Sequence, residues 1–181
     1  MTIRLESKRL YYEHLEEKHF EGFCRQESDP EVMKYIRAAS EDREAARKKF
    51  NDYLSYMSAH PKLGMFAVFE KETQNQIGLG VLFHIEMKPE TGRYEVGYRF
   101  DQTSWGKGYA TELTHRLLQY GFYELGLKEI CGTTDPKNLV SQKVLMKAGM
   151  KNMGITTEFR TGSQFFVLNR DEYHPSDDYK S

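Results

Sequence analysis

The spacing of apolar residues changes once along this chain, near residue 101, and the change restricts the folds open to it. Before that point, residues 65–70, 77–87 and 93–101 are short apolar or alternating segments separated by turn residues. Such segments predict three strands in an antiparallel meander. After it, residues 110–124 repeat apolar side chains every three or four positions, which predicts a helix. A mixed α/β protein follows.

The remaining segments extend this pattern to both ends of the chain. Capping and turn residues mark where helices begin and where strands end. We expect a mixed, mostly antiparallel central sheet flanked by helices, in a single domain over residues 1–181. The further predicted elements are a strand at 9–14, a helix at 16–25, a short helix from Asp29-Pro30, a helix capped by Ser40 and ending at His60-Pro61, a strand at 127–133, a helix from the cap Asn138 to Ala148 with Gly149 as its stop, and a hairpin of 155–160 and 164–169.

Composition argues against several classes of partner. Lys and Arg number 26 against 27 Asp and Glu, a net charge of -1, so there is no basic excess for nucleic acid. Cys24 and Cys131 lack metal-ligand spacing and make no disulfide framework, and the six histidines are scattered. We therefore expect no metal and a cytoplasmic protein. No segment has the apolar length that a membrane span needs. A monomer and a homodimer both stay open.

The segment from Trp105 to Glu112, WGKGYATE, joins the last predicted strand of the meander to the helix. Glycines let the backbone turn tightly and approach a ligand closely. The first amides of a helix have no partner within the helix and carry the positive end of its dipole. A phosphate group fits such a position.

Other interpretations of this loop are possible from its residues alone. The glycines could simply make a turn. A P-loop would need Ser or Thr where Gly108 stands, and a dinucleotide fingerprint would need a glycine where Thr111 stands. These differences argue against a nucleotide-binding α/β protein, which is the third function considered.

The neighbouring motifs identify a family. Residues 95–150 resemble the GNAT superfamily of acyl-CoA-dependent N-acetyltransferases, and are most similar to the ribosomal-protein N-terminal acetyltransferase (RimJ/RimL-like) branch. That branch has a W-G-x-G-Y-A-T-E loop, then a helix, a strand and N-x-x-S-x-x-x-L-x-K-x-G, which here begins at Asn138 and ends at Gly149. Residues 28–36 and the final hairpin are similar as well. The resemblance implies a GNAT fold, with the fourth and fifth predicted strands splayed apart.

It also implies a binding site for acetyl-CoA, the acetyl donor. In the family pattern [QR]-x-x-G-x-[GA], Gly108 and Ala110 are in place and Trp105 replaces the first residue. The loop amides are expected to hold the pyrophosphate, the strand end to line the pantetheine, and Asn138 to bond to it. The residues so implied are Tyr98, Arg99, Phe100, Gly106, Lys107, Gly108, Tyr109, Ala110, Thr111, Asn138 and Ser141.

The chemistry that the resemblance implies is direct attack of an amine on the thioester, with no enzyme nucleophile. An α-amine has a pKa of about 8 and a lysine amine one of about 10.4, so lysine or polyamine acceptors depend more on a general base. Glu95 is the candidate base. Ser141 is the candidate acid for the leaving thiolate, with Tyr98 and Tyr109 as substitutes. A backbone amide of Tyr98 or Arg99 would steady the oxyanion, freed by a bulge at Gly97.

Two functions stay open at this stage. The first is an enzyme that acetylates a primary amine, which could belong to a protein N-terminus, an amino acid, a polyamine or an aminoglycoside. The second is a non-catalytic acyl-CoA-binding sensor or interaction module, which needs the loop but neither base nor acid.

Overall fold

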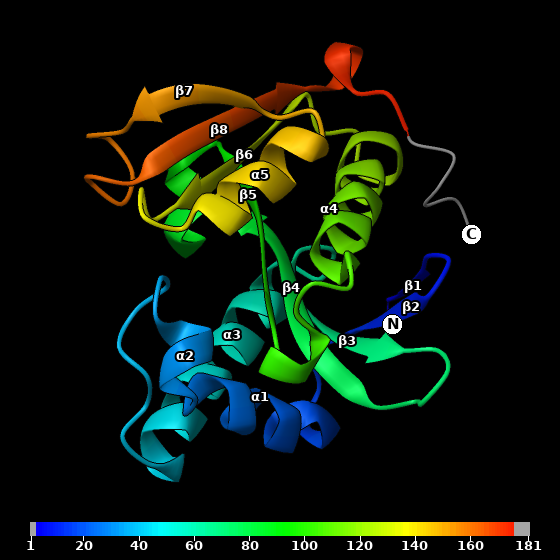
Figure 1. Cartoon of the computed structure of the whole chain (residues 1–181), viewed down its shortest axis with the longest axis vertical. Helices are drawn as coiled ribbons and strands as arrows, with labels where there is room; N and C mark the ends of the chain where they lie inside the picture. The colour runs from blue at the N-terminus through cyan, green and yellow to red at the C-terminus, as the bar shows by residue number, and fades with distance from the viewer. Residues whose placement is uncertain (1–2, 176–181) are drawn as a thin grey trace.

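The computed structural model describes residues 3–175 as an eight-stranded sheet with helices on both faces (Figure 1). The strands are β1 (Arg4–Glu6), β2 (Leu10–His14), β3 (Gly64–Glu70), β4 (Gln76–His84), β5 (Tyr94–Phe100), β6 (Glu129–Thr134), β7 (Lys151–Ile155) and β8 (Gln164–Asn169). Their order is β1-β2-β3-β4-β5-β6-β8-β7. Only the β5–β6 pair among these strands is parallel. The predicted mixed, mostly antiparallel sheet is confirmed.

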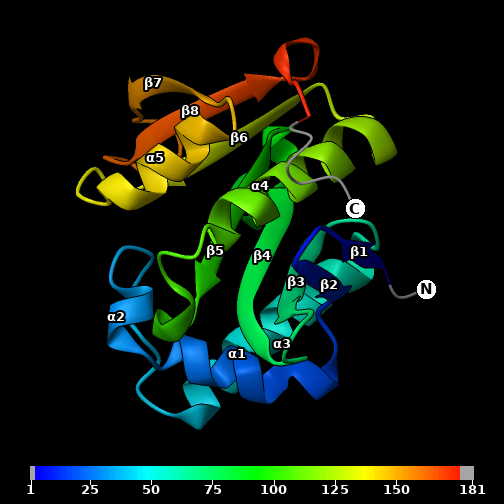
Figure 2. The ribbon, with the colours of Figure 1, turned by 45° about the vertical axis from the view of Figure 1, so that its right-hand side comes forward.

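The helices divide between the two faces of this sheet. They are α1 (Phe20–Glu27), α2 (Pro30–Met33), α3 (Arg43–Ala59), α4 (Tyr109–Gln119) and α5 (Leu139–Lys147). The first three cover one face of β3, β4 and β5, while α4 and α5 lie together on the other (Figures 1 and 2). Within residues 3–175, none of the helices combines the length and apolar character that crossing a membrane requires.

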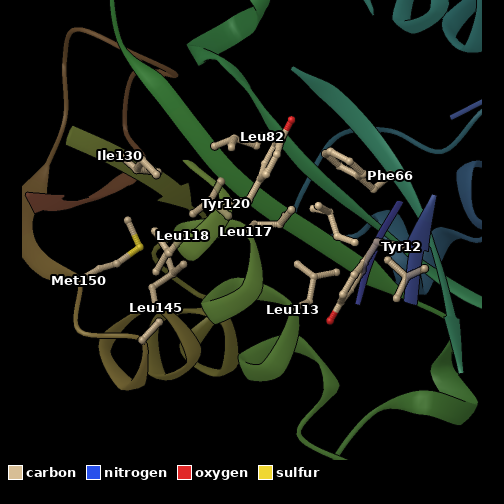
Figure 3. Packing of buried hydrophobic residues seen from close by; sticks show 14 of the residues in the cluster. Tyr12, Phe66, Leu82, Leu113, Leu117, Leu118, Tyr120, Ile130, Leu145 and Met150 are labelled. Atoms are coloured by element: carbon tan, nitrogen blue, oxygen red, sulfur yellow. The ribbon is translucent and has the colours of Figure 1, made fainter. Parts of the chain in front are cut away.

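The larger core cluster packs α4 onto the sheet (Figure 3). Leu113, Leu117 and Leu118 are fully buried, as the three- and four-residue spacing of this helix predicts. A Cβ added to Gly80 in β4 would lie 2.8 Å from Leu113, so the missing side chain lets the helix approach closely. This packing fixes the start of α4 next to the end of β5. Figure 3 also shows Tyr12, Phe66, Leu82, Tyr120, Ile130, Leu145 and Met150 in this cluster.

Local signals placed several element ends correctly. The Asp29 side chain accepts hydrogen bonds from two amides of α2, and the Asn138 side chain accepts one from the amide of Ser141 in α5. Gly149 follows α5 with a φ of 91°, in the left-handed region. The three predicted end signals are confirmed.

The predicted cap of α3 was wrong. Asp42, not Ser40, is the N-cap residue, and its carboxylate accepts the amide proton of Ala45. Ser40 is buried instead, where its hydroxyl contacts Glu27 and Lys49. Both residue types cap helices well, so tertiary contacts decided between them.

The terminal hairpin also differs from its prediction. Its first strand is β7 at residues 151–155, not 155–160. Residues 156–163 form a loop instead, closed by hydrogen bonds of Thr156 with Ser163 and Gly162. The strand lies at the sheet edge with mostly exposed side chains, so it has no apolar alternation to reveal it. The strand β1 was missed because its three residues are too few to show a strand period.

Two other boundaries shift. The β4 strand ends at His84, because the backbone at Glu86 and Met87 is left-handed and turns the chain out of the sheet. The helix predicted to reach residue 124 ends at Gln119 and continues as one π-helical turn, Tyr120–Glu124.

Candidate active site

The glycine loop between β5 and α4 has a conformation that glycine adopts readily. Gly106 and Gly108 have φ angles of 75° and 80°. Gly108 is the N-cap residue of α4 and offers no side chain to the first amides of the helix. Those amides, from Tyr109 to Thr111, therefore face a ligand position with the positive end of the helix dipole. A diphosphate fits this cradle.

The loop is anchored from behind by the N-terminal segment. Arg9 donates from Nη1 to the carbonyl of Lys107 at 2.8 Å and from Nε to the carboxylate of Glu112 at 2.8 Å. Glu112 lies in the first turn of α4, is 1% exposed and also accepts from the hydroxyl of Ser7. Tyr109 packs under the Arg9 guanidinium and donates its hydroxyl proton to Glu70. These contacts hold Tyr109 as a packing residue.

Strands β5 and β6 separate just beyond Glu95. In the described chain their ladder consists of one position, Glu95 opposite Cys131. From there β6 continues along β8, while β5 runs toward α1 and α2 (Figures 1 and 2). The backbone of β5 after Glu95 thus has an edge without a strand partner, as the splayed pair predicts.

Predicted site residues of β5 and α5 come together at the opening between β5 and β6. Tyr98 of β5 reaches α5, and its hydroxyl lies 3.0 Å from Oγ of Ser141. Burial raises the pKa of Tyr98, opposed by its bond to Ser141, so the hydroxyl keeps its proton. Asn138 lies at the start of the same helix, where its side-chain oxygen caps the amide of Ser141. The structure therefore brings Tyr98, Asn138 and Ser141 together.

The side chains of two further predicted residues of β5 lie on opposite faces of the sheet. Phe100 is buried in the core with α4, and its carbonyl accepts the indole proton of Trp105 at 2.8 Å. The side chain of Arg99 lies on the opposite face, where it pairs with Glu27 of α1 at 2.6 Å. Only the backbone of Arg99 borders the opening.

The bulge expected at Gly97 is absent from the ladder between β4 and β5. Gly97 pairs with Val81 in continuous register, and its φ is not in the left-handed region. The reason is that the opening arises from the divergence of β6 and needs no extra residue in β5.

Glu95 lies at the point of divergence and is 2% exposed. Its Oε1 atom accepts from the hydroxyl of Thr133 at 2.5 Å and from Nη1 of Arg160 at 2.8 Å. Its Oε2 atom has no hydrogen-bond partner among the described residues. Burial raises the pKa of Glu95, and Arg160 and Thr133 oppose the rise. Such a carboxyl group can take a proton at Oε2.

A cleft of about 270 Å³ opens on the same side of the sheet as Glu95. Phe83 lines it and stands opposite Glu95 in the β4–β5 ladder, and Arg160, which lines it too, is the ion-pair partner of Glu95. The lining residues are Arg37, Tyr53, Phe83, Glu86, Met87, Lys88 and Arg160. These residues could not be identified from the sequence, because they come from four separate segments and belong to no motif.

The walls of this cleft contain strained backbone. Glu86, Met87 and Arg160 have φ angles of 54°, 55° and 40°, although none of them is glycine. The two segments are joined, since the amide of Arg160 donates to Oε1 of Glu86 at 3.0 Å. Left-handed conformations of this kind cost free energy and cluster at functional sites. The cleft is therefore a candidate for the second part of the site.

The arrangement has the parts that acyl transfer to an amine requires. The glycine loop can hold a diphosphate, and the opening between β5 and β6 leads from it to Glu95. The hydroxyl groups of Tyr98 and Ser141 lie on one side of β5, and the carboxyl group of Glu95 lies on the other. The loop, the opening and their residues fit acetyl-CoA as the acetyl donor.

Comparison with solved structures supports the fold. An acetyltransferase of the GNAT family from Bacillus anthracis aligns with a TM-score of 0.78 and 26% identity, over 94% of this chain and all of that one. A ribosomal-protein-S5-alanine acetyltransferase from Vibrio fischeri aligns with a TM-score of 0.74 over 96% of this chain and all of that one. Its identity is 17%, so it supports the fold and leaves the predicted branch as a hypothesis.

Sequence comparison leads to the same group of proteins. The chain is 29% identical over 155 residues to the uncharacterized N-acetyltransferase p20 of Bacillus licheniformis, covering 86% of each chain. The model of the acetyltransferase (GNAT) domain family matches residues 9–151. This chain therefore belongs to the GNAT acetyltransferase family and is an acyltransferase.

Proposed function

We propose that this chain, as a single domain over residues 1–181, transfers the acetyl group of acetyl-CoA to a primary amine by direct attack on the thioester. The observation that carries the proposal is the position of Glu95. It lies where β5 and β6 separate, next to the cleft, with an oxygen that has no partner in the described chain. A base at that point can serve an amine that approaches the opening from the cleft.

The donor is held by backbone more than by side chains. The amides of residues 106–111 bind the pyrophosphate, the free edge of β5 from Tyr98 to Phe100 binds the pantetheine, and Asn138 closes the site from α5. Lys107 is exposed beside the loop and adds positive charge there. The left-handed glycines and the unpaired strand edge support this placement.

In the proposed reaction Glu95 removes a proton from the ammonium form of the acceptor, through Oε2, and the neutral amine attacks the thioester carbonyl. A backbone amide of Tyr98 or Arg99 at the free strand edge stabilises the oxyanion. Raising the pKa of Glu95 by burial makes it a stronger base than an exposed carboxylate.

The departing thiolate needs a proton. Tyr98 and Ser141 share a hydrogen bond, so we propose that they act as one donor, with Ser141 nearer the leaving group and Tyr98 behind it. The raised pKa of Tyr98 means that this hydroxyl is protonated at neutral pH. Tyr109 is not proposed as the proton donor, because its hydroxyl already donates to Glu70 and its ring packs against Arg9.

The acceptor is a small-molecule amine or a protein N-terminus, the latter by likeness to the RimJ/RimL-like branch. We further propose a cytoplasmic enzyme, since Cys24 and Cys131 are both free thiols. The enzyme acts as a monomer or a homodimer.

Release of free thiol from acetyl-CoA tests the proposal. The purified full chain is assayed with a panel of neutral, anionic and cationic amines and with short peptides that have free N-termini. We expect turnover with at least one class, and a loss of about 100-fold in Glu95→Gln. Binding of CoA by calorimetry without turnover across the panel would favour the non-catalytic module. Turnover that is equal in Glu95→Gln would remove Glu95 from the mechanism.

A further inference from the structure

Positive charge is in excess beside the cleft, around one buried carboxylate. Glu27 of α1 is fully buried, and three cations share it. Arg99 contacts it at 2.6 Å, Lys49 at 2.8 Å and Arg37 at 2.9 Å. Three cations around one carboxylate leave two positive charges without a carboxylate partner in this cluster. Of these cations only Arg99 is held away from water, since its side chain is 6% exposed against 35% for Arg37 and 32% for Lys49. A buried cation that is incompletely paired is costly unless an anion joins it.

One of these cations is incompletely bonded. Arg99 is 7% exposed, and its Nε and Nη2 atoms have no hydrogen-bond partner among residues 3–175. Only Nη1 is engaged, by Glu27 and by the sulfur of Met33. Buried nitrogens of this kind normally have partners, so two donors without one indicate a missing acceptor.

The cluster is continuous with the cleft. Arg37 lines the cleft and shares Glu27 with Arg99. Tyr53 lines it as well, with its hydroxyl 3.5 Å from Nη1 of Arg37. At the other end Lys88 and Arg160 add two cations, bonded to Glu86 and Glu95. The cleft therefore has more cationic than anionic groups along its length.

The order of residues on β5 determines how a ligand could extend from Glu95 to Arg99. Glu95, Gly97 and Arg99 share the face toward α1–α3, because side chains alternate along a strand. Between the two charged residues, Gly97 has no side chain, and Cγ2 of Val81 in β4 lies 3.0 Å from where its Cβ would be. Strand β5 thus places no side chain between Glu95 and Arg99, and Val81 is the neighbour there.

We propose that the acceptor is an anionic amine, whose carboxylate or phosphate group binds Arg37 and Arg99 while its amino group faces Glu95. This inference rests on the proposed function, and it narrows the acceptor class. A guanidinium binds either anion through paired N–H donors. The same cations repel polyamines and aminoglycosides, which are therefore poor acceptors.

Matched acceptor pairs test the preference. Glycine is compared with glycinamide, and O-phosphoethanolamine with ethanolamine, by thiol release from acetyl-CoA. We expect kcat/KM to be at least about tenfold higher for the anionic member of one pair, and the pair that responds tells carboxylate from phosphate. Arg37→Gln is expected to reduce this preference, whereas Lys48→Gln, an exposed control on α3, leaves it unchanged. Equal or better rates with glycinamide, ethanolamine or spermidine would overturn the inference.

Binding measured without turnover separates the two proposals. Malonate and inorganic phosphate are titrated by calorimetry into the full chain saturated with CoA, so that the glycine loop is occupied. Heat of binding that disappears in Arg37→Gln supports the anion site, even if no amine releases thiol and the proposed reaction fails. Turnover of any amine together with no binding of either anion refutes the anion site and leaves the acetyl transfer standing.

Discussion

The guanidinium of Arg160 lies 2.8 Å from the carboxylate of Glu95, which joins an exposed loop to a carboxyl group buried in the sheet. Arg160 comes from the loop between β7 and β8, and its backbone is strained at a φ of 40°. The charge of this residue lowers the pKa of Glu95, which burial raises. The loop therefore helps to set the protonation state of the candidate base.

Replacement of Glu95 by Gln is expected to lower kcat about 100-fold and to remove the acidic limb of the pH–rate profile. In the native enzyme kcat is expected to rise with pH as Glu95 loses its proton, at a pH above the usual range for glutamate because burial raises the pKa of Glu95. Glu129→Gln is a suitable control, since Glu129 also pairs with an arginine, Arg93, but lies away from the opening. A variant that keeps the native acidic limb would contradict this assignment.

The same variant has a predicted effect on stability. The pKa of Glu95 is higher in the folded than in the unfolded state, so the folded protein binds this proton more tightly. That contribution is complete below the unfolded pKa and is lost as pH rises through the folded pKa. Glu95→Gln should therefore show a smaller fall in Tm with rising pH than the native chain, when both are followed by thermal unfolding between pH 4 and pH 9. If the Tm of both proteins falls equally with rising pH, Glu95 does not contribute to the pH dependence of stability.

Replacement of Arg160 by Met should move the acidic limb of the pH–rate profile to higher pH, by about one unit, because the cation that favours the charged form of Glu95 is lost. At high pH, where Glu95 has lost its proton in both proteins, the rate of Arg160→Met is expected to come closer to the native rate. Arg170→Met, an exposed arginine near the C-terminal end of the described chain, serves as the control and should keep the native limb. A limb that moves to lower pH would disprove the role given to Arg160.

Replacement of Gly108 by Ala should raise the KM for acetyl-CoA about tenfold, since the left-handed backbone that presents the loop amides becomes strained. The added Cβ meets only Arg9 at 3.5 Å, so the cost is conformational, about 1–2 kcal/mol. Gly126→Ala is matched to it, with a φ of 73° and no atom within 4 Å. The control should lose similar stability and keep its KM. If both variants keep the native KM, the loop does not bind the donor.

Replacement of Tyr98 by Phe should lower kcat by about 10- to 100-fold when the leaving thiol is basic. A thioester of a more acidic thiol should recover much of the rate, since it departs without a proton donor. Tyr120→Phe is the control, because this buried hydroxyl bonds to the carbonyl of Lys62 at 2.9 Å and lies in the core. It should lose about 1 kcal/mol of stability with kcat unchanged. An equal loss with both thioesters would assign Tyr98 to structure only.

Much of the fold could be predicted because its signals are local. Asp29, Asn138 and Gly149 act within a few residues of themselves, and the period of α4 is visible in its own sequence. The predictions failed where distant contacts decide the outcome. Ser40 is drawn into the Glu27 cluster and leaves the cap of α3 to Asp42.

The proposed donor and acceptor halves of the site also differ in how far their residues could be identified from the sequence. The residues proposed for the donor half lie in two segments, 98–111 and 138–141, and their assignment follows from the resemblance of these motifs to a family pattern. The acceptor half has no such motif. Arg99 and Glu27 are 72 positions apart, and Arg160 and Glu95 are 65 apart. Glutamate and methionine seldom adopt a left-handed backbone, so the sequence does not reveal that Glu86 and Met87 have one.

The anchoring of the glycine loop by Arg9 and Glu112 has a thermodynamic consequence. Lys107 and the first turn of α4 are tied to the N-terminal segment, so the loop shape proposed to bind the donor is held by the chain itself. Little conformational entropy is then lost when the donor arrives. Association should be fast and close to rigid-body docking, so that differences in affinity between acyl-CoA donors appear in their rates of dissociation.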